Sequence, residues 1–334
     1  MSETIPSEQE LAYQQDRSDI IRANIKRFYI YFVLALVVVV FSVVRLDEVN
    51  WFERGHFLNP NNIINLLRIA VPIITVSGAF TFLMIAEYID LSIGSAMSLA
   101  SVIFAWLILN GFNFQIAFLA TVFAGVIMGL INSLLVMKLN ITPVIATLIT
   151  LSLYKGIALL IVPDGTSSIK SIGDLKMPAW INDYAREDVL VGLPMAFFVA
   201  IAIVIVLIVL QRRTVIGKYS AAIGGNKTAA ELSGINPVYW VSILYIIVGI
   251  SAAMAGMARA SYMSLGDPLS SDGMELWVII AVLLGGTKFT GGEGQVEKTV
   301  IGAIIIIVVT VGMLTVIPAY WQTFALGAVL LIAV

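Results

Sequence analysis

Long apolar runs separated by short polar turns make up most of this chain. A helix needs about 20 mostly apolar residues to cross the hydrocarbon of a bilayer with its backbone hydrogen bonds satisfied internally. The pattern therefore predicts an all-α polytopic membrane protein with about ten transmembrane helices. We expect these spans at residues 28–44, 63–86, 93–109, 116–137, 143–162, 193–210, 238–258, 276–287, 298–317 and 319–334.

Composition supports a membrane protein and leaves little room for a soluble domain. Hydrophobic residues make up 60% of the 334 positions and charged residues 12%, against about a quarter charged in soluble domains. We expect a cytosolic N-terminal tail at residues 1–27 and a single transmembrane domain at 28–334. The tail is polar, begins acidic and becomes basic only before the first run, so it does not resemble a signal peptide. The last run stops at Val334 without a polar flank, so we expect a few further residues.

Lysine and arginine residues favour a cytosolic N-terminus. This orientation makes residues 211–236 a cytosolic loop and residues 163–192 the longest outside loop, ordered only in part. It places a larger set of positive residues in the cytosol: Arg17, Arg22, Lys26, Arg27, Lys138, Arg212, Arg213, Lys218, Lys227, Lys288 and Lys298. The smaller outside set is Arg45, Arg54, Lys170, Lys176, Arg186 and Arg259.

The cytosolic loop 211–236 is a polar island in an apolar chain. Thr228 and Glu231 have the spacing of a capping box, and Gly234 followed by Pro237 is typical of a helix end. We therefore expect one short helix here. Its exposed alanines and the Gly224-Gly225 pair would let another protein approach closely. The alternative is a plain capped turn between two spans.

Two polar segments interrupt the apolar pattern. The first is residues 87–95, which contain Glu87 and Asp90, and the second is residues 285–294. Interrupted segments in both halves of a transporter indicate broken helices around a central path. The alternative is two tight cytosolic turns, in which glycine supplies positive φ. The second segment contains Gly285, Gly286, Gly291, Gly292 and Gly294.

Other ionisable residues have weaker functional signals. Arg68, Lys155 and Glu275 lie within or beside apolar runs, where each could line a hydrated path. Arg68 and Lys155 could also extend their long stems to the nearest interface. His56, the only histidine, has no partner for a metal site.

Catalytic patterns are absent from the sequence. No P-loop spacing precedes Lys218 or Lys227, and no serine lies in a nucleophile elbow. The chain has no cysteine, and its net charge of −2 argues against nucleic acid binding. We therefore expect a transporter subunit rather than an enzyme, with no catalytic residue, metal or cofactor of its own.

Several ordered motifs resemble the permease subunits of ABC importers of the ribose, galactose and xylose type, over nearly the whole chain from about residue 60. They are Ile89-Asp90-Leu91-Ser92-Ile93-Gly94-Ser95, Gly129-Leu130-Ile131-Asn132, Asn140-Ile141-Thr142-Pro143 through Leu148, Tyr154-Lys155-Gly156, Gly217-Lys218, Ala222 to Asn226, Ala229 to Ile235, Glu275-Leu276, Leu284 to Thr287 and Gly291 to Gly294.

This resemblance implies a fold similar to the type II importers and a multi-pass protein of a bacterial inner membrane. It implies a second permease copy or a sister permease, cytosolic ATPase subunits that use ATP and Mg²⁺, and an external sugar-binding protein that is periplasmic or lipid-anchored. The loop 211–236 would then contain the coupling helix that docks on the ATPase. Its candidate residues are Lys218, Gly224, Gly225, Asn226, Thr228, Ala229, Ala230, Glu231 and Gly234.

The resemblance also implies a translocation path lined from the middle spans, for a pentose or hexose. Our candidates are Glu87, Asp90, Ser92, Asn132, Thr147 and Glu275. The chain departs from the family pattern at Glu87-Tyr88 and at Lys288-Phe289-Thr290, which weakens the assignment of a substrate. The same scaffold could carry nucleosides or a signalling sugar. An ion-coupled secondary transporter using Glu87 and Asp90 is a further alternative.

Overall fold

The computed structural model describes residues 28–42, 57–162, 168–169, 171–172, 175–186, 189–190 and 192–314, together with residues 321, 324, 327 and 331. The tail 1–27, His56, part of the loop 163–192 and most of the run 319–334 lie outside the described residues.

The described chain is almost entirely helical. The first helix is Phe28–Ser42, and the others are α2 (Pro60–Ile85), α3 (Ile93–Leu109), α4 (Phe114–Ser133), which continues into a π-helical turn (Leu134–Lys138), α5 (Pro143–Ile161), α6 (Ala179–Arg186), α7 (Met195–Arg213), α8 (Val215–Gly225), α9 (Lys227–Leu232), α10 (Pro237–Met263), α11 (Met274–Leu284) and α12 (Val296–Leu314). Two short strands, β1 (Ser171–Ile172) and β2 (Leu175–Lys176), pair antiparallel.

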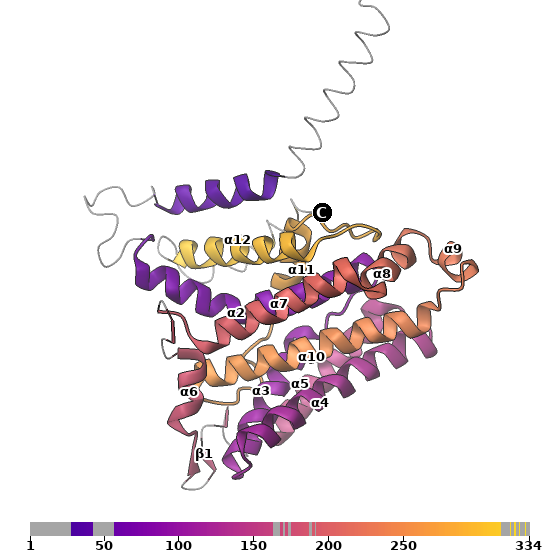
Figure 1. Ribbon diagram of the computed structural model, residues 1–334. Coiled ribbons are helices and arrows are strands. Elements are labelled where there is room, and N and C mark those ends of the chain that lie inside the picture. The colour runs from indigo at the N-terminus through magenta and orange to yellow at the C-terminus, as the bar shows by residue number, and fades with distance from the viewer. Residues whose placement is uncertain are drawn as a thin grey trace, which may run out of the picture.

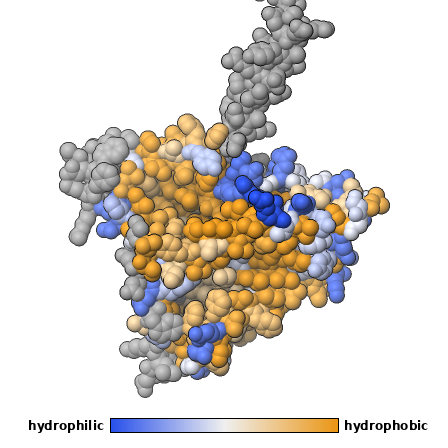
Figure 2. Space-filling model, in the orientation of Figure 1, coloured by the Kyte–Doolittle hydropathy of each residue, from blue (hydrophilic) through white to orange (hydrophobic). Residues whose placement is uncertain are grey.

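Helix length and composition confirm a polytopic membrane protein. Six of the described helices are long and apolar enough to cross a bilayer, and three shorter apolar helices accompany them at Phe28–Ser42, Ile93–Leu109 and Met274–Leu284. Figure 2 shows hydrophobic side chains over the middle of the visible face and hydrophilic ones gathered toward its ends. This distribution matches a protein whose middle faces lipid.

Helix α10 is central to the packing. It contacts α2, α3 and α4, while α11 and α12 pack together against α2. Figure 1 shows α8 and α9 at one end of the long helices and α6 with β1 at the opposite end. The polar loop 211–236 and the described part of the loop 163–192 therefore lie at opposite ends of the molecule, which agrees with their expected placement on opposite sides of a membrane.

Glycines allow α4 and α10 to touch through their backbones. A Cβ atom built on Gly249 of α10 would lie 2.2 Å from the carbonyl oxygen of Gly125 of α4, and one on Gly125 would lie 2.5 Å from the carbonyl oxygen of Gly249. Gly129 of α4 likewise approaches the carbonyl oxygen of Tyr245. Lipid supplies no hydrophobic drive for helix pairing, so close van der Waals contact between small residues stabilises this pair.

Two long helices each end in a non-helical segment that leads into a shorter apolar helix. Residues 86–92 connect α2 to α3, and residues 264–273 connect α10 to α11. In both segments an aspartate accepts a hydrogen bond from the amide two residues on, from Ser92 to Asp90 and from Leu269 to Asp267, each at 2.8 Å. The sequence pattern had placed the second interruption at 285–294, after α11. In the structure the helix breaks earlier, at residues 264–273. The complete short helix α11 then separates this break from the glycine-rich turn 285–294.

Helix α10 is also longer than expected. We predicted a span ending at residue 258, but the helix continues to Met263, and Ser264 ends it in the left-handed conformation with φ of 60°. Arg259, which we had counted as an outside loop residue, is therefore a helical residue. Its guanidinium donates two hydrogen bonds to the carbonyl oxygen of Ser270, at 3.1 Å and 2.7 Å.

We expect Gly249→Ala to lower the yield of folded protein, because the new methyl group meets backbone atoms that cannot rotate away. Overpacking of this kind costs about 1–3 kcal/mol. Gly156→Ala is the matched control, because nothing lies within 4 Å of its added Cβ. Alanine stabilises a helix interior by roughly 0.5–1 kcal/mol over glycine, so the control should be neutral or stabilising. Thermal unfolding in detergent measures both, and equal midpoints for the two variants would contradict the close contact.

Candidate functional site

A buried polar cluster forms where the segment 86–92 meets α4. The side chains of Asp90 and Asn132 are 3% and 2% exposed. The Asp90 carboxylate accepts three hydrogen bonds, from the Ser92 amide at 2.8 Å, the Ser92 hydroxyl at 2.6 Å and the Asn132 amide nitrogen at 2.9 Å. The same nitrogen of Asn132 donates to the Ser92 hydroxyl at 2.9 Å. Asp90, Ser92 and Asn132 are thus all hydrogen-bonded to one another.

Helix α5 joins this network through two side chains. The Thr147 hydroxyl accepts a hydrogen bond from the Leu91 amide at 3.0 Å. The Tyr154 hydroxyl donates toward the Met128 carbonyl at 2.8 Å and lies 3.2 Å from Oδ1 of Asn132. The turn that contains Asp90 is consequently fixed to both α4 and α5.

Four of the six path candidates are brought together here: Asp90, Ser92, Asn132 and Thr147. All four are buried. Hydrogen bonds within the cluster give these buried polar groups partners, which avoids the cost of a buried donor or acceptor left unsatisfied. Within the described part of the chain, no ion pair involves Asp90. The four residues form a buried joint, by which we mean the hydrogen-bonded cluster that fixes the segment 86–92 to α4 and α5. Their place on a translocation path stays a prediction.

The other two path candidates lie elsewhere. Glu87 is exposed and has φ of 67°, a left-handed turn position directly after α2. Glu275 is in the first turn of α11, where its carboxylate approaches Gly94 at the start of α3. Glu275 therefore marks the contact between the two short helices rather than the Asp90 network.

The carbonyl oxygen of Ile85, at the end of α2, is the meeting point of three segments. It accepts a hydrogen bond from the Gly292 amide at 2.8 Å. A Cβ atom on Gly224 of α8 would lie 1.9 Å from this oxygen, and one on Gly291 would lie 2.9 Å from it. Only residues without a side chain fit there, so α8 and the segment 285–294 are both held against the end of α2.

The glycine-rich segment 285–294 is a turn beside α8. Gly286, Gly291 and Gly292 have positive φ values of 83°, 70° and 81°. Gly285 packs against Thr299 of α12, and Gly294 against Thr287. The turn therefore returns the chain from α11 to α12 at the end of the molecule where α8 and α9 lie.

The loop 211–236 contains two helices where one was expected. The predicted capping box is wrong: Asn226, not Thr228, caps α9, and its side-chain oxygen accepts a hydrogen bond from the Ala229 amide at 2.9 Å. Thr228 is already helical. Gly234 has the left-handed φ of 84° that we expected at the helix end.

Exposure divides the candidate coupling residues into two groups. Gly224 and Ala230 are buried and face the rest of the protein, which corrects the prediction that Gly224 lies open to a partner. The exposed group is Lys218, Gly225, Asn226, Thr228, Ala229, Glu231 and Gly234. Sequence reasoning missed Leu232, which is 85% exposed at the end of α9. Its signal was a large apolar side chain in a polar island.

Gln211, at the end of α7, is a second missed residue. Its side-chain amide donates to the Gly294 carbonyl at 3.0 Å and accepts from the Val296 amide at 2.9 Å. It thereby ties α7 to the turn before α12. Arg212 beside it pairs with Glu297 of α12. A glutamine at the end of an apolar run gives no sequence signal for this role.

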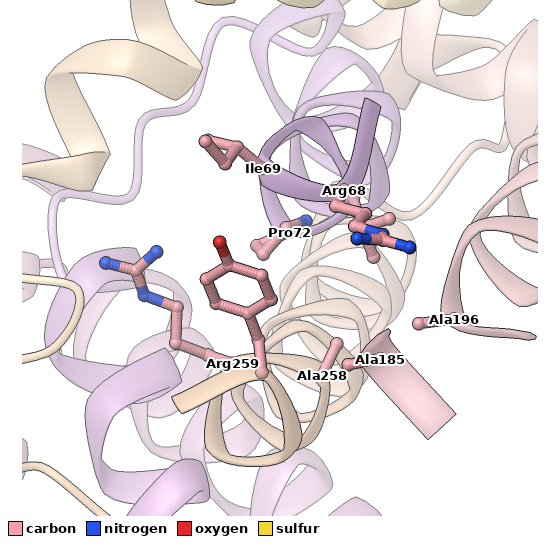
Figure 3. A pocket seen from close by; sticks show the side chains of 9 residues that line it. Arg68, Ile69, Pro72, Ala185, Ala196, Ala258 and Arg259 are labelled. Atoms are coloured by element: carbon pink, nitrogen blue, oxygen red, sulfur yellow. The ribbon is translucent and has the colours of Figure 1, made fainter. Parts of the chain in front are cut away.

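Two arginines, Arg68 of α2 and Arg259 of α10, lie toward the end of the long helices that is opposite α8 and α9. Figure 3 shows Arg68 and Arg259 on opposite sides of Pro72, around a small pocket. Lys155, which we expected to line a path or to extend to the interface, pairs with Asp272 at 2.8 Å. A separate cavity of about 420 Å³ is lined by apolar and aromatic side chains, among them Phe104, Phe118 and Met257.

Comparison with known proteins places the chain among transport permeases. The profile of the family described as "Branched-chain amino acid transport system / permease component" matches residues 62–334. The D-allose transport system permease protein of Escherichia coli K12 is 29% identical over 307 residues, which cover 91% of this chain and 89% of that protein. The ribose import permease protein of Bacillus subtilis 168 is 33% identical over 279 residues, 83% of this chain and 85% of that protein.

A third relative is the L-arabinose ABC transporter permease protein of Azospirillum brasilense, 32% identical over 284 residues, which cover 83% of this chain and 80% of that protein. No solved structure was found to match the chain.

The Asp90 network predicts a specific pattern of loss and rescue. In Asp90→Asn, an amide nitrogen would face the amide nitrogen of Asn132, so buried donors would lose acceptors at about 1–3 kcal/mol. We expect a lower unfolding temperature. The exchange Asp90→Asn with Asn132→Asp restores one donor and one acceptor and should recover most of the loss. Glu87→Gln, at an exposed turn, is the control. An exchange variant no more stable than the single variant would contradict this network.

Proposed function

The chain belongs to the branched-chain amino acid transport system / permease component family, and from this membership we propose that it is the membrane-spanning permease of an ATP-binding cassette importer for a monosaccharide. Its relatives carry the names of D-allose, ribose and L-arabinose permeases, and a fructose import permease of Bifidobacterium longum is 29% identical over 254 residues. A sugar is therefore favoured over an amino acid as the substrate.

The exposed helix α9 carries this proposal. In Figure 1 it projects beyond the ends of the long helices. Its surface combines small residues with Leu232, and an apolar side chain left this exposed at the polar end of a membrane protein is suited to contact with another protein. We assign the contact to a cytosolic ATPase subunit, which would bind ATP and Mg²⁺. The N-terminus is then cytosolic, and the membrane is the bacterial inner membrane.

The structure offers a route from this helix to the interior. Gly224 of α8 holds the α8–α9 unit against the carbonyl of Ile85, and Asp90 follows Ile85 by only five residues. A force applied to α9 would reach the end of α2 and then the turn held by Asn132 and Thr147. ATP-driven closure would shift the population between two states of this joint, provided that each state has its own contacts.

A second permease, identical or related, would complete the path. Helix α5 presents apolar side chains that are exposed in the single chain, including Ile145, Leu148, Ile149 and Leu153. We propose that this face meets the second permease across the path, and that an external sugar-binding protein delivers the solute at the α6 end.

Bulky residues on α9 should uncouple the transporter. We expect Gly225→Trp with Ala229→Trp to lower sugar uptake by about tenfold or more, a loss of at least roughly 1.4 kcal/mol of coupling. The protein should fold normally, because both positions are exposed and no atom lies within 4 Å of a Cβ added at Gly225. Asn110→Trp, exposed beyond the far end of α3, is the control.

The assay uses the chain co-expressed with an ATPase subunit, reconstituted in lipid with binding protein and each of the four sugars. ATPase activity stimulated by loaded binding protein, together with ATP-dependent uptake, supports the proposal. Uptake by the lone chain down an ion gradient would replace it with a secondary transporter. Unchanged coupled uptake in the double variant would remove α9 from the docking surface.

A further inference from the structure

The cavity of about 420 Å³ lies beneath α6, and its walls come from α3, α4, α6, α7 and α10. Nine of its ten lining residues are aliphatic or aromatic, and Ser261 is the exception. The Ser261 hydroxyl already donates a hydrogen bond to the carbonyl oxygen of Ile181. The cavity therefore suits hydrocarbon rather than a polyhydroxylated solute.

The size and the flexibility of the lining also favour an apolar ligand. An apolar cavity of about 150 Å³ already excludes water and binds benzene, and pockets for small ligands span about 300–1,000 Å³. Three methionines, Met195, Met254 and Met257, contribute to the wall. Methionine side chains are unbranched and adapt to irregular shapes, so this wall can follow a flexible chain.

The cavity leads from the surface of the protein into its interior. Phe114 and Met195, at the first turns of α4 and α7, are 39% and 45% exposed. The opposite wall is formed by Phe104, Ile181 and Met257, which are at most 4% exposed. A ligand that enters between α4 and α7 would thus end among buried side chains.

The surface around the opening belongs to the lipid-facing part of the molecule. Both α4 and α7 are long and apolar enough to cross a bilayer. Their outward residues include Leu119, Phe123, Ile205 and Val206, all of them more than half exposed. Because this surface faces acyl chains in a membrane, the cavity opens onto lipid hydrocarbon.

Helix α6 closes the cavity at one end. It contacts α7 and α10, and Nε of Arg186 donates to the Tyr262 carbonyl at 2.7 Å. Ile181 and Ala185 of α6 are buried, whereas Asp183 and Arg186 are exposed. An amphipathic helix of this kind lies in a membrane interface with its apolar face toward the hydrocarbon. The space beneath α6 is therefore at the depth of the outermost part of the acyl chains.

We propose that this cavity binds one acyl chain of a membrane phospholipid. The chain enters between Phe114 and Met195 and ends against Phe104 and Met257, beneath α6. It completes the apolar packing under this helix and supports it against α10. The site is independent of the transported solute, so its test does not depend on the proposed function.

The test uses the full chain reconstituted in bilayers of phosphatidylethanolamine and phosphatidylglycerol. A trace phospholipid carries a light-activated diazirine at the end of one acyl chain, and peptide mass spectrometry locates the labelled residues. We expect labels at Ile181 and Met257, which bulk lipid cannot reach because both are buried. Val248, equally buried in α10 and outside the lining, is the internal control. Labelling of Ile181 and Met257 no stronger than that of Val248 would overturn the site.

A substitution that fills the cavity should displace the chain. Val199→Trp adds an indole to the α7 wall and should lower labelling of Met257 by about tenfold, which corresponds to about 1.4 kcal/mol of binding. Val206→Trp, on the exposed face of the same helix, should leave labelling unchanged. Unchanged labelling in a folded Val199→Trp protein would contradict the proposal. If this variant does not fold, the comparison with Val248 in the unaltered chain is decisive by itself.

Hydrogen exchange of α6 tests whether the bound chain supports this helix. Removal of lipid should speed exchange of amides 181–186 by about tenfold, because local opening becomes easier when packing is lost. The acceleration should be smaller in Val199→Trp, whose indole takes part of the space of the chain. Equal acceleration in both proteins would overturn the support of α6 by the lipid.

Discussion

The contact at the carbonyl oxygen of Ile85 is the constraint on which the arrangement of this protein depends. A helix end leaves its last carbonyls without partners inside the helix, and here one of them is bound by the Gly292 amide and covered by Gly224. Because Gly224 and Gly291 have no Cβ atom, α8 and the turn before α12 approach the end of α2 at backbone distance. The segment that would receive force from a partner is therefore in direct contact with the long helix that leads to Asp90, without a flexible linker between them.

The two broken helices share one local hydrogen-bond pattern. Each break contains an aspartate that accepts a hydrogen bond from the amide two residues on, and each leads into a short apolar helix. The second break also contacts the helix that follows the first, because the Ser271 amide donates to the Ser98 hydroxyl of α3 at 3.0 Å. In a lipid environment irregular backbone is tolerated only where protein or a hydrated cavity satisfies it. At the first break Ser92, Asn132 and Thr147 hydrogen-bond to Asp90 and Leu91, whereas Ser270 and Asp272 of the break at 264–273 line a cavity.

The two breaks therefore differ in the surroundings of their polar residues. The Asp90 network connects α3, α4 and α5 as a joint, and its residues are buried against one another. The segment 264–273 supplies Ser270 and Asp272 to the lining of a cavity of about 260 Å³.

The sequence by itself determined the class of protein, the positions of most helices and the helical character of the polar loop 211–236, because hydrophobic length, glycine and helix-ending residues act locally along the chain. Motifs that resemble a known family also singled out Asp90, Ser92, Asn132 and Thr147 as polar candidates, and the structure brings these four together in one buried cluster. Only the tertiary structure decided which groups meet: that Gly224 faces inward against Ile85, that Gln211 ties α7 to the start of α12 and that Arg259, Ser270 and Trp277 line one cavity with residues of α2 and α12. These contacts join residues far apart in the chain, and their partners are set by the packing of whole helices, which no local pattern records.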